Sequence, residues 1–139
     1  MNERRHVDIT ELYELFKERK DCYFVCCDIK SLLPINDISH KAGDLAILET
    51  AKRMEQAAGN EDIVFRIGGD EFVLLTNSKD ILYAENISKC ILKKNGQPII
   101  YEGKEIPLSM YAGVTRFNGN IIKYDELFIQ LHNAIRENK

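Results

Sequence analysis

No apolar run in this chain approaches the roughly 20 residues that a helix needs to cross a bilayer. The longest hydrophobic stretches extend over only a few residues. The amino end also lacks the hydrophobic segment of a secretory signal, because charged residues follow Met1 closely. These absences predict a soluble, cytoplasmic domain that makes no contact with a membrane.

An excess of one charge sign is also missing. The chain has 19 Lys and Arg residues against 22 Asp and Glu residues, and its formal net charge is -3. Without a basic field, neither a nucleic acid nor an anionic membrane surface is attracted by charge. We therefore expect no polynucleotide partner.

Internal repeats, linkers and low-complexity tracts are absent as well. The chain has 139 residues, of which 45% are hydrophobic. A chain of this length buries roughly two thirds of its unfolded surface, which suffices for one core. One compact domain with one active or binding site is the expectation.

Cysteine is present, but not in the spacing of a metal site. Cys22, Cys26 and Cys27 lie in or beside an apolar run, and neither a C-x-x-C pair nor a His partner accompanies them or Cys90. This spacing argues against zinc. We interpret the first three as compact hydrophobic side chains of a buried strand in a reducing cytosol.

Hydrophobic periodicity and turn residues predict the order α-β-α-β-β-α-β-α, with a hairpin before the last long strand. A turn containing Pro34 is expected after the first strand, and the Gly68–Asp70 segment is expected to be a tight hairpin whose glycines supply positive φ. The order predicts an α+β sandwich of the ferredoxin-like kind, with a mostly antiparallel sheet flanked by helices. The predicted elements are helix 8–19, strand 22–29, a long helix that ends before 59–60, strands 63–67 and 72–75, helix 79–94, a hairpin of 97–101 and 104–106, strand 108–114 and helix 124–139.

Acidic residues occur at two strand ends that this arrangement brings together. Asp28 ends the first strand, and Asp70 with Glu71 lies at the turn of the next hairpin. Neighbouring carboxylates repel unless a cation lies between them, and Mg²⁺ prefers oxygen ligands while it retains positions for substrate phosphates. The pattern indicates a magnesium-phosphate site. On spacing alone, a turn residue and a solvated strand end explain these acids equally well.

The segment Arg66-Ile67-Gly68-Gly69-Asp70-Glu71-Phe72 resembles the signature of the GGDEF family. Three upstream segments are also similar to the family in their order and separation. Asp28-Ile29 matches its strand-end Asp, and Asn36-Asp37 matches its Asn-Asp pair. The stretch from His40 to Asp44 matches its Gly-His-x-x-Gly-Asp stretch. Downstream, the stretch from Leu108 to Val114 resembles its last core strand. The resemblance covers nearly the whole chain, and it implies a single GGDEF domain over 1–139 with a nucleotide-cyclase-like sandwich fold.

The resemblance implies a diguanylate cyclase, which condenses two GTP molecules into cyclic di-GMP. One GTP is held by each of two domains that meet face to face. The implied metal ligands are the side chains of Asp28 and Asp70 and the backbone carbonyl of Ile29, with Mg²⁺ or Mn²⁺ as the cofactor. Glu71 completes the acidic cluster, and Asp70 or Glu71 is the implied base.

Nucleotide-binding residues are carried over in the same way. Asn36 and Asp44 are expected to read the guanine edge, because an amide and a carboxylate together match its donors and acceptors. Gly68, Gly69 and Lys139 are implied as further contacts of GTP. Residue types alone leave alternatives: Asn36 suits turn or cap chemistry, and Asp44 suits an acid in the first turn of a helix.

Several positions depart from the family pattern. Leu33 stands where the family commonly has a lysine near the triphosphate, and Lys30 is a candidate substitute cation. In the family's inhibitory product site, Gly59 replaces the arginine while Asp62 remains, which predicts weak binding of cyclic di-GMP. Arg136 replaces a tyrosine of the last helix. These departures support the alternative of a catalytically degenerate domain that binds GTP or a partner protein and regulates a fused module.

Both ends look like shortened copies of the family's entry and exit motifs. We expect one domain cut from a larger signalling protein, with a sensor or phosphodiesterase domain as its neighbour. Neighbouring domains commonly bring two GGDEF domains together, so we expect the isolated domain to be a monomer or a weak dimer.

Overall fold

The computed structural model describes residues 9–19, 21–117, 129, 133, 135 and 136, with side chains from residue 14 onward. Most of the predicted elements are present, with small shifts at their ends. The helices are α1 Ile9–Glu18, α2 Leu32–Ile38, α3 His40–Ala57 and α4 Ile81–Lys93, and the strands are β1 Tyr23–Ile29, β2 Ile63–Arg66, β3 Glu71–Leu75, β4 Pro98–Tyr101, β5 Lys104–Pro107 and β6 Met110–Arg116.

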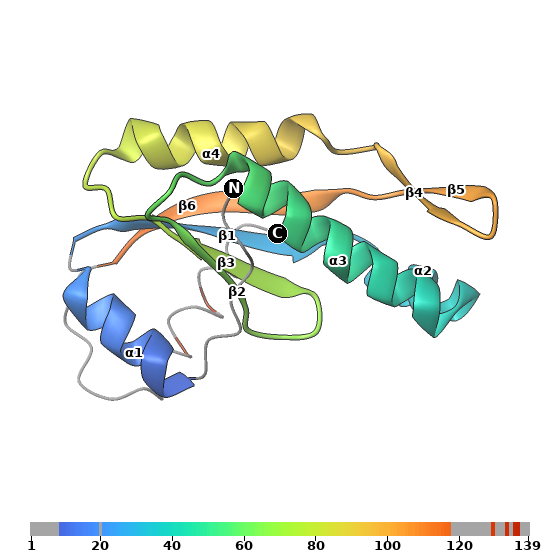
Figure 1. Cartoon of the computed structure of the whole chain (residues 1–139), viewed down its shortest axis with the longest axis horizontal. Coiled ribbons are helices and arrows are strands. Elements are labelled where there is room, and N and C mark those ends of the chain that lie inside the picture. Colours follow the sequence, from blue (N-terminus) through green and yellow to red (C-terminus); the bar gives the residue numbers. More distant parts are fainter. Residues whose placement is uncertain (1–8, 20, 118–128, 130–132, 134, 137–139) are drawn as a thin grey trace.

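The main sheet has the strand order β2-β3-β1-β6, and each pair of neighbours is antiparallel. Helices α3 and α4 cover one face of this sheet, and α1 lies on the other face (Figure 1). Strands β4 and β5 form a separate hairpin that extends beyond the main sheet. The structure thus confirms an α+β sandwich with a mostly antiparallel sheet.

Strand β1 lies in the centre of the sheet and supplies side chains to both layers of core. Val25 and Cys27 belong to the core beneath α3 and α4, whereas Phe24 and Cys26 belong to the core beneath α1. The ring of Phe16 in α1 meets that of Phe24 edge to face, with the centroids 5.7 Å apart. The cysteines of β1 are therefore buried apolar residues of a strand that alternates its faces, as predicted.

The structure has a helix, α2, where the sequence predicts a turn around Pro34. Ser31 precedes the helix with a left-handed φ of 62°, and Pro34 lies within the first turn. The first N–H groups of a helix have no intrahelical acceptor, so the proline costs no hydrogen bond at this position. Pro34 is compatible with a helix start as well as with the turn that the sequence predicts.

A buried arginine connects α3 to the segments that flank the β4–β5 hairpin. Arg53 is 1% exposed, and its guanidinium donates to the carbonyl oxygens of Leu108 at 2.9 Å and Gln97 at 2.7 Å. Its Nε donates to Glu49 Oε2 at 2.9 Å. Because the Leu108 N–H also donates to Gln97, the last strand begins at Met110 and not at residue 108 as predicted.

The predicted carboxyl-terminal helix is described only in part. Ile129, Asn133, Ile135 and Arg136 are helical, and Ile135 packs into the core beneath α1. Lys139 lies outside the described residues.

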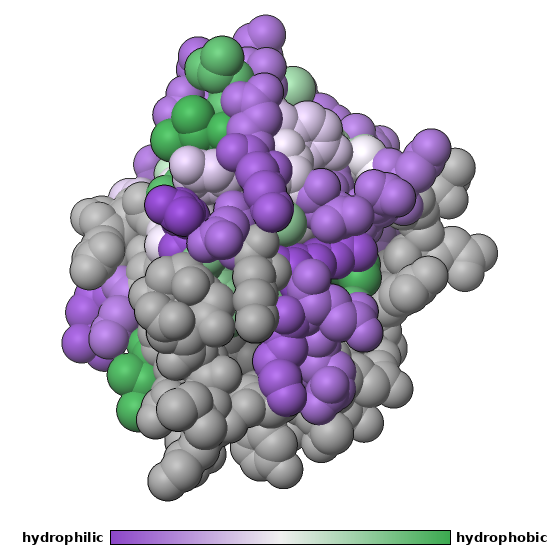
Figure 2. All heavy atoms as spheres, turned by 90° about the vertical axis from the view of Figure 1, so that its left-hand side faces the viewer, coloured by the Kyte–Doolittle hydropathy of each residue, from purple (hydrophilic) through white to green (hydrophobic). Residues whose placement is uncertain are grey.

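The described helices include none that is both long and apolar enough to cross a membrane. Among the residues that are coloured in Figure 2, hydrophilic ones predominate on the end of the molecule that lies on the left of Figure 1, and hydrophobic ones are most frequent near the top.

Candidate active site

The carboxyl end of β1 delivers one acid to the edge of the sheet where α2 begins (Figure 1). Asp28 is 2% exposed and is paired in register with Glu71 of β3 and with Tyr111 of β6. Residues directly opposite each other in antiparallel strands point to the same face. Asp28 and Glu71 therefore lie side by side on the α1 face, beyond the core that ends with Cys26.

The pKa of Cys26 is consistent with the position of Glu71 on the same face of the sheet. Burial, and next to it the negative charge of Glu71, raises the pKa of Cys26 to about 12. A thiol with such a pKa is protonated and unreactive at neutral pH. The Asp28 and Glu71 carboxylates therefore lie next to a protonated, unreactive thiol of the core.

The turn between β2 and β3 places Asp70 next to the end of β1. The Ile29 N–H donates to the Asp70 carbonyl at 3.0 Å. Arg66 closes the turn, because its Nε donates to the Gly68 carbonyl at 2.8 Å and its Nη2 to the Gly69 carbonyl at 2.7 Å. This role of Arg66 is not predictable from the sequence, because the contacts are to backbone atoms.

Glycines 68 and 69 form the predicted hairpin, but the predicted reason for them was wrong. Positive φ occurs at Gly96 and Gly103 among the described glycines, and not at this pair. A Cβ on Gly68 would lie 2.3 Å from Glu71 Oε1, so this glycine makes room for that carboxylate. A Cβ on Gly69 would meet nothing within 4 Å, so open space adjoins the backbone there.

The predicted guanine-reading residues lie on α2 and α3. Asn36 belongs to α2 and its amide lies against Gly43, where a Cβ would be only 1.7 Å from Asn36 Oδ1. Asp44 is the next residue of α3 and is exposed. The glycine thus brings Asn36 close to the helix turn that carries Asp44.

The structure contradicts the alternative roles that residue types suggested for these two. Ser39 caps α3, since its hydroxyl accepts a hydrogen bond from the Lys41 N–H at 3.1 Å, while Asn36 lies inside α2. Helix α3 has no acid in its first turn, so Asp44 lies beyond the turn in which an acid interacts favourably with the helix dipole. Neither residue is explained by local helix chemistry.

The oxygen ligands at this edge fit a magnesium ion that is shared with a substrate. Among the described residues, no group of three or more Asp, Glu, His or Cys side chains forms a complete metal site. Mg²⁺ is commonly bound by one or two carboxylates together with substrate phosphates, so it needs no such group. Asp28 at the strand end and Asp70 at the adjoining turn are two carboxylates whose backbones lie next to each other, which is compatible with such a smaller set of ligands.

Two positions that depart from the family pattern lie close to this edge. Leu33 in α2 is 77% exposed. Lys30 follows β1 directly, is half-buried, and places its Nζ 4.6 Å from the centroid of the Tyr111 ring. The cation therefore lies on the strand end and not on α2.

The position that matches the inhibitory site of the family is occupied by an internal hydrogen-bond cluster. Asp62 is 6% exposed, and its Oδ2 accepts from the Tyr83 hydroxyl at 2.6 Å and from the Gly59 N–H at 2.6 Å. A Cβ on Gly59 would lie 2.4 Å from the Tyr83 hydroxyl. Tyr83 lies 21 residues from Asp62, in α4, so no local sequence signal indicates this contact.

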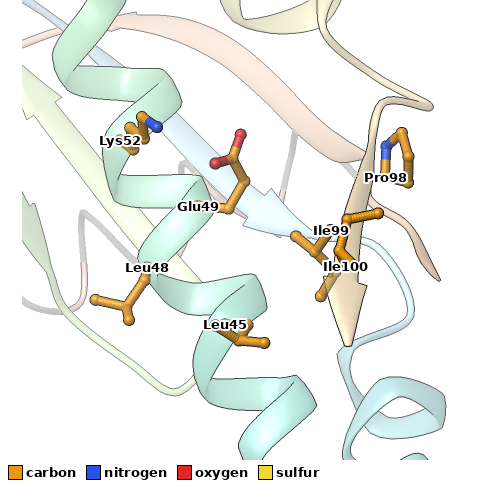
Figure 3. A pocket seen from close by; sticks show the side chains of 7 residues that line it. All are labelled: Leu45, Leu48, Glu49, Lys52, Pro98, Ile99 and Ile100. Atoms are coloured by element: carbon orange, nitrogen blue, oxygen red, sulfur yellow. The ribbon is translucent and has the colours of Figure 1, made fainter. Parts of the chain in front are cut away.

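A further cleft, of about 310 Å³, lies between α3 and β4 (Figure 3). Apolar side chains dominate its lining, with one acid and one base from α3. None of the predicted site residues is part of it. The lining residues are Leu45, Leu48, Glu49, Lys52, Pro98, Ile99 and Ile100.

An antiparallel sheet flanked by helices, with carboxylates at the end of its central strand and at the adjoining turn, defines a nucleotide-cyclase-like sandwich domain. The family model described as "Diguanylate cyclase, GGDEF domain" matches residues 4–139. The chain belongs to the GGDEF domain family. Cyclases of this family generally use a divalent metal ion.

Individual relatives agree with this assignment. Diguanylate cyclase A of Treponema denticola is 32% identical over 117 residues, which cover 81% of this chain and 31% of that protein. The bifunctional diguanylate cyclase/cyclic di-GMP phosphodiesterase MucR of Pseudomonas aeruginosa is 29% identical over 109 residues, which cover 78% of this chain and 16% of that protein. The chain thus spans less than a third of the length of these curated relatives.

Solved structures give the same fold. An EAL/GGDEF domain protein from M. capsulatus has a TM-score of 0.73 and 25% identity, over 91% of this chain and 86% of that one. A sensory box/GGDEF family protein from Caulobacter crescentus has a TM-score of 0.71 at 22% identity, over 94% and 85%. The names of these relatives show that GGDEF domains occur in one protein with other domains, EAL among them.

Proposed function

We propose that the chain is the catalytic domain of a diguanylate cyclase, which joins two GTP molecules into cyclic di-GMP. The observation that carries the proposal is the register that sets buried Asp28 opposite Glu71, with Asp70 joined to the end of β1 through Ile29. The relatives named as diguanylate cyclases support this reaction. We propose that the domain works in the cytoplasm, where GTP is available.

The acidic edge is proposed to bind Mg²⁺ or Mn²⁺ together with the triphosphate. The side chains of Asp28 and Asp70 and the Ile29 carbonyl would hold the ion, which offsets triphosphate charge and polarises the α-phosphate when bound. Asp70 or Glu71 accepts the proton of the 3′-hydroxyl. The 3′-oxygen of one GTP forms a bond to the α-phosphorus of the other, and pyrophosphate leaves; a second, reciprocal step closes the ring.

Guanine is proposed to bind between α2 and α3. Asn36 and the exposed Asp44 present an amide and a carboxylate, which together match the donors and acceptors of guanine and disfavour adenine. The close contact of Asn36 with Gly43 sets the spacing of the two groups. This arrangement supports GTP over ATP as the substrate.

The phosphates are proposed to approach the β2–β3 turn. The open space beside Gly69 leaves the backbone accessible, and Gly68 keeps the Glu71 side chain close to the turn. Lys139, which lies outside the described residues, remains a proposed phosphate contact on the basis of the family resemblance.

Two domains are needed for one product, because each holds one GTP. The partner is proposed to be a second copy of this domain, brought close by further domains of a longer protein, such as a sensor or an EAL phosphodiesterase domain.

Exposed Leu33 at the lysine position favours a second candidate, a domain that binds GTP and regulates its neighbours without turnover.

Formation of cyclic di-GMP from GTP tests the proposal. The domain is fused to a dimerising coiled coil, and product is measured by chromatography in the presence of Mg²⁺. Asp70→Ala is expected to abolish product, whereas Glu105→Ala, which removes an exposed carboxylate of the β4–β5 hairpin, retains it. A fused domain that yields no product, or equal product from Asp70→Ala, contradicts the cyclase assignment.

A further inference from the structure

Lys30 extends the acidic face of β1 by one more side chain. Its N–H donates to the Ser109 carbonyl at 2.9 Å, so the pairing of β1 with β6 continues past the end of the strand. Side chains two residues apart on an extended strand point to the same face. Lys30 therefore lies on the face that carries Asp28 and Glu71.

Tyr111 holds the ammonium group of Lys30 on that face. Tyr111 is paired in register with Asp28, and the Lys30 Nζ lies 4.6 Å from the centroid of its ring. An ammonium above an aromatic face is attracted by the negative charge of the π-system. The Tyr111 ring is 37% exposed and the Lys30 side chain is half-buried, so the contact lies partly open to solvent.

Arg66 is another positively charged residue near this edge in the described part of the chain, and its guanidinium is engaged within the β2–β3 turn. The Arg66 guanidinium donates to the carbonyl oxygens of Gly68 and Gly69. Leu33, which is highly exposed on α2, provides no charge. A triphosphate at the edge formed by Asp28 and Asp70 therefore finds the Lys30 ammonium as a cation held by a fixed contact.

We propose that Lys30 is a phosphate-binding residue of this site and that Tyr111 is its positioning residue. Lys30 thereby restores, from the strand end, the positive charge that Leu33 lacks. The ligand chemistry is that of a nucleoside triphosphate, and its identity as GTP rests on the proposed function.

Calorimetric titration of the whole chain with GTP and Mg²⁺ tests this inference. Lys30→Ala is expected to weaken GTP binding about tenfold, the effect of losing one charge-assisted contact, whereas Lys30→Arg retains most of the affinity. Lys104→Ala in the β4–β5 hairpin removes an exposed charge away from the edge and is the control. Guanosine, which has no phosphate, is titrated against each variant and is expected to bind wild type and Lys30→Ala equally.

Tyr111 is tested through its dependence on Lys30. Tyr111→Leu is expected to weaken GTP binding in the wild-type background, Tyr111→Phe to retain it, and Tyr111→Leu to have no further effect once Lys30 is alanine. Wild-type affinity for GTP in Lys30→Ala, or an equal loss in Lys104→Ala, overturns the inference alone. Absence of GTP binding by the wild-type chain overturns both the inference and the proposed function.

Discussion

Two adjacent glycines of the β2–β3 turn, Gly68 and Gly69, have different surroundings. Neither has a positive φ, so alanine is compatible with the backbone at both positions. Only at Gly68 does an added Cβ collide, and the colliding atom is the end of the Glu71 side chain. Gly68 thus leaves space for a carboxylate, whereas the open space beside Gly69 is the space proposed for the phosphates.

Alanine substitutions separate these two requirements. Gly69→Ala is expected to change the free energy of unfolding by less than about 0.5 kcal/mol and to weaken GTP binding, because its Cβ enters the space proposed for the phosphates. Gly68→Ala displaces the Glu71 carboxylate and is expected to lower turnover while the fold is retained. Urea unfolding and GTP titration check both variants, and unchanged GTP affinity in Gly69→Ala contradicts the proposed phosphate position.

The hydrogen bond between Tyr83 and Asp62 contributes to stability at the position that matches the family's inhibitory site. Burial, followed by the hydrogen bond to Asp62 and its charge, raises the pKa of Tyr83 to about 12. The ordinary tyrosine pKa is about 10, so the stabilisation from this proton is present below about pH 10 and is lost as pH rises toward 12.

Replacement of Tyr83 by Phe tests this role. The variant is expected to lose about 1 kcal/mol of unfolding free energy at neutral pH and to show a shallower loss of stability above pH 10 than wild type. Tyr101→Phe in the β4–β5 hairpin is the control. An identical alkaline stability profile for Tyr83→Phe and wild type contradicts the assignment.

Because Asp62 is occupied internally, the wild-type domain is also expected to bind cyclic di-GMP only weakly at this position.

At the scale of elements, Arg53 joins α3 to the backbone on either side of the β4–β5 hairpin. Its removal would leave the buried Leu108 carbonyl oxygen and the Glu49 carboxylate without this donor, and the Gln97 carbonyl would keep only the Leu108 N–H as donor. Arg53→Ala is expected to lower the free energy of unfolding by about 3 kcal/mol, measured by urea denaturation, while Lys52→Ala on the exposed side of α3 changes it little. A loss below about 1 kcal/mol would show that the hairpin does not depend on this anchor.

The elements were predictable where a single periodic signal decided them. The long helix, the central strand and the acids at the strand ends follow from apolar periodicity, and the structure confirms these elements. Helix α2 was missed because Pro34 marks a helix start as readily as a turn. The pairing of Asp28 with both Glu71 and Tyr111 depends on strand register, which a single sequence does not specify.

The candidate site was predictable only through the family motif. Asp28 and Asp70 were identified from their positions, but spacing alone explained them equally well as a solvated strand end and a turn residue. The Lys30–Tyr111 contact joins residues far apart in sequence, and the contact of Asn36 with Gly43 depends on a helix that was not predicted. These are tertiary contacts, and local patterns carry no information about them.

At the scale of the whole molecule, the proposed function needs two domains. In that proposal each domain contributes one acidic edge and one guanine-binding pair, so a single copy would bind GTP but would complete no ring. The curated relatives are more than three times as long as the matched segment, which leaves room for domains that bring two copies together. Linking two copies raises their effective concentration without any new contact at the site.

The most direct test of the central claim compares the unfused chain with the same chain on a dimerising coiled coil, at equal concentration, with GTP affinity and cyclic di-GMP formation measured on each sample. The account predicts the same GTP affinity in both samples and cyclic di-GMP formation mainly in the fused one. GTP binding without product in the fused dimer would contradict the cyclase assignment and identify a regulatory GTP-binding domain. Absence of GTP binding in both samples would contradict the nucleotide site itself.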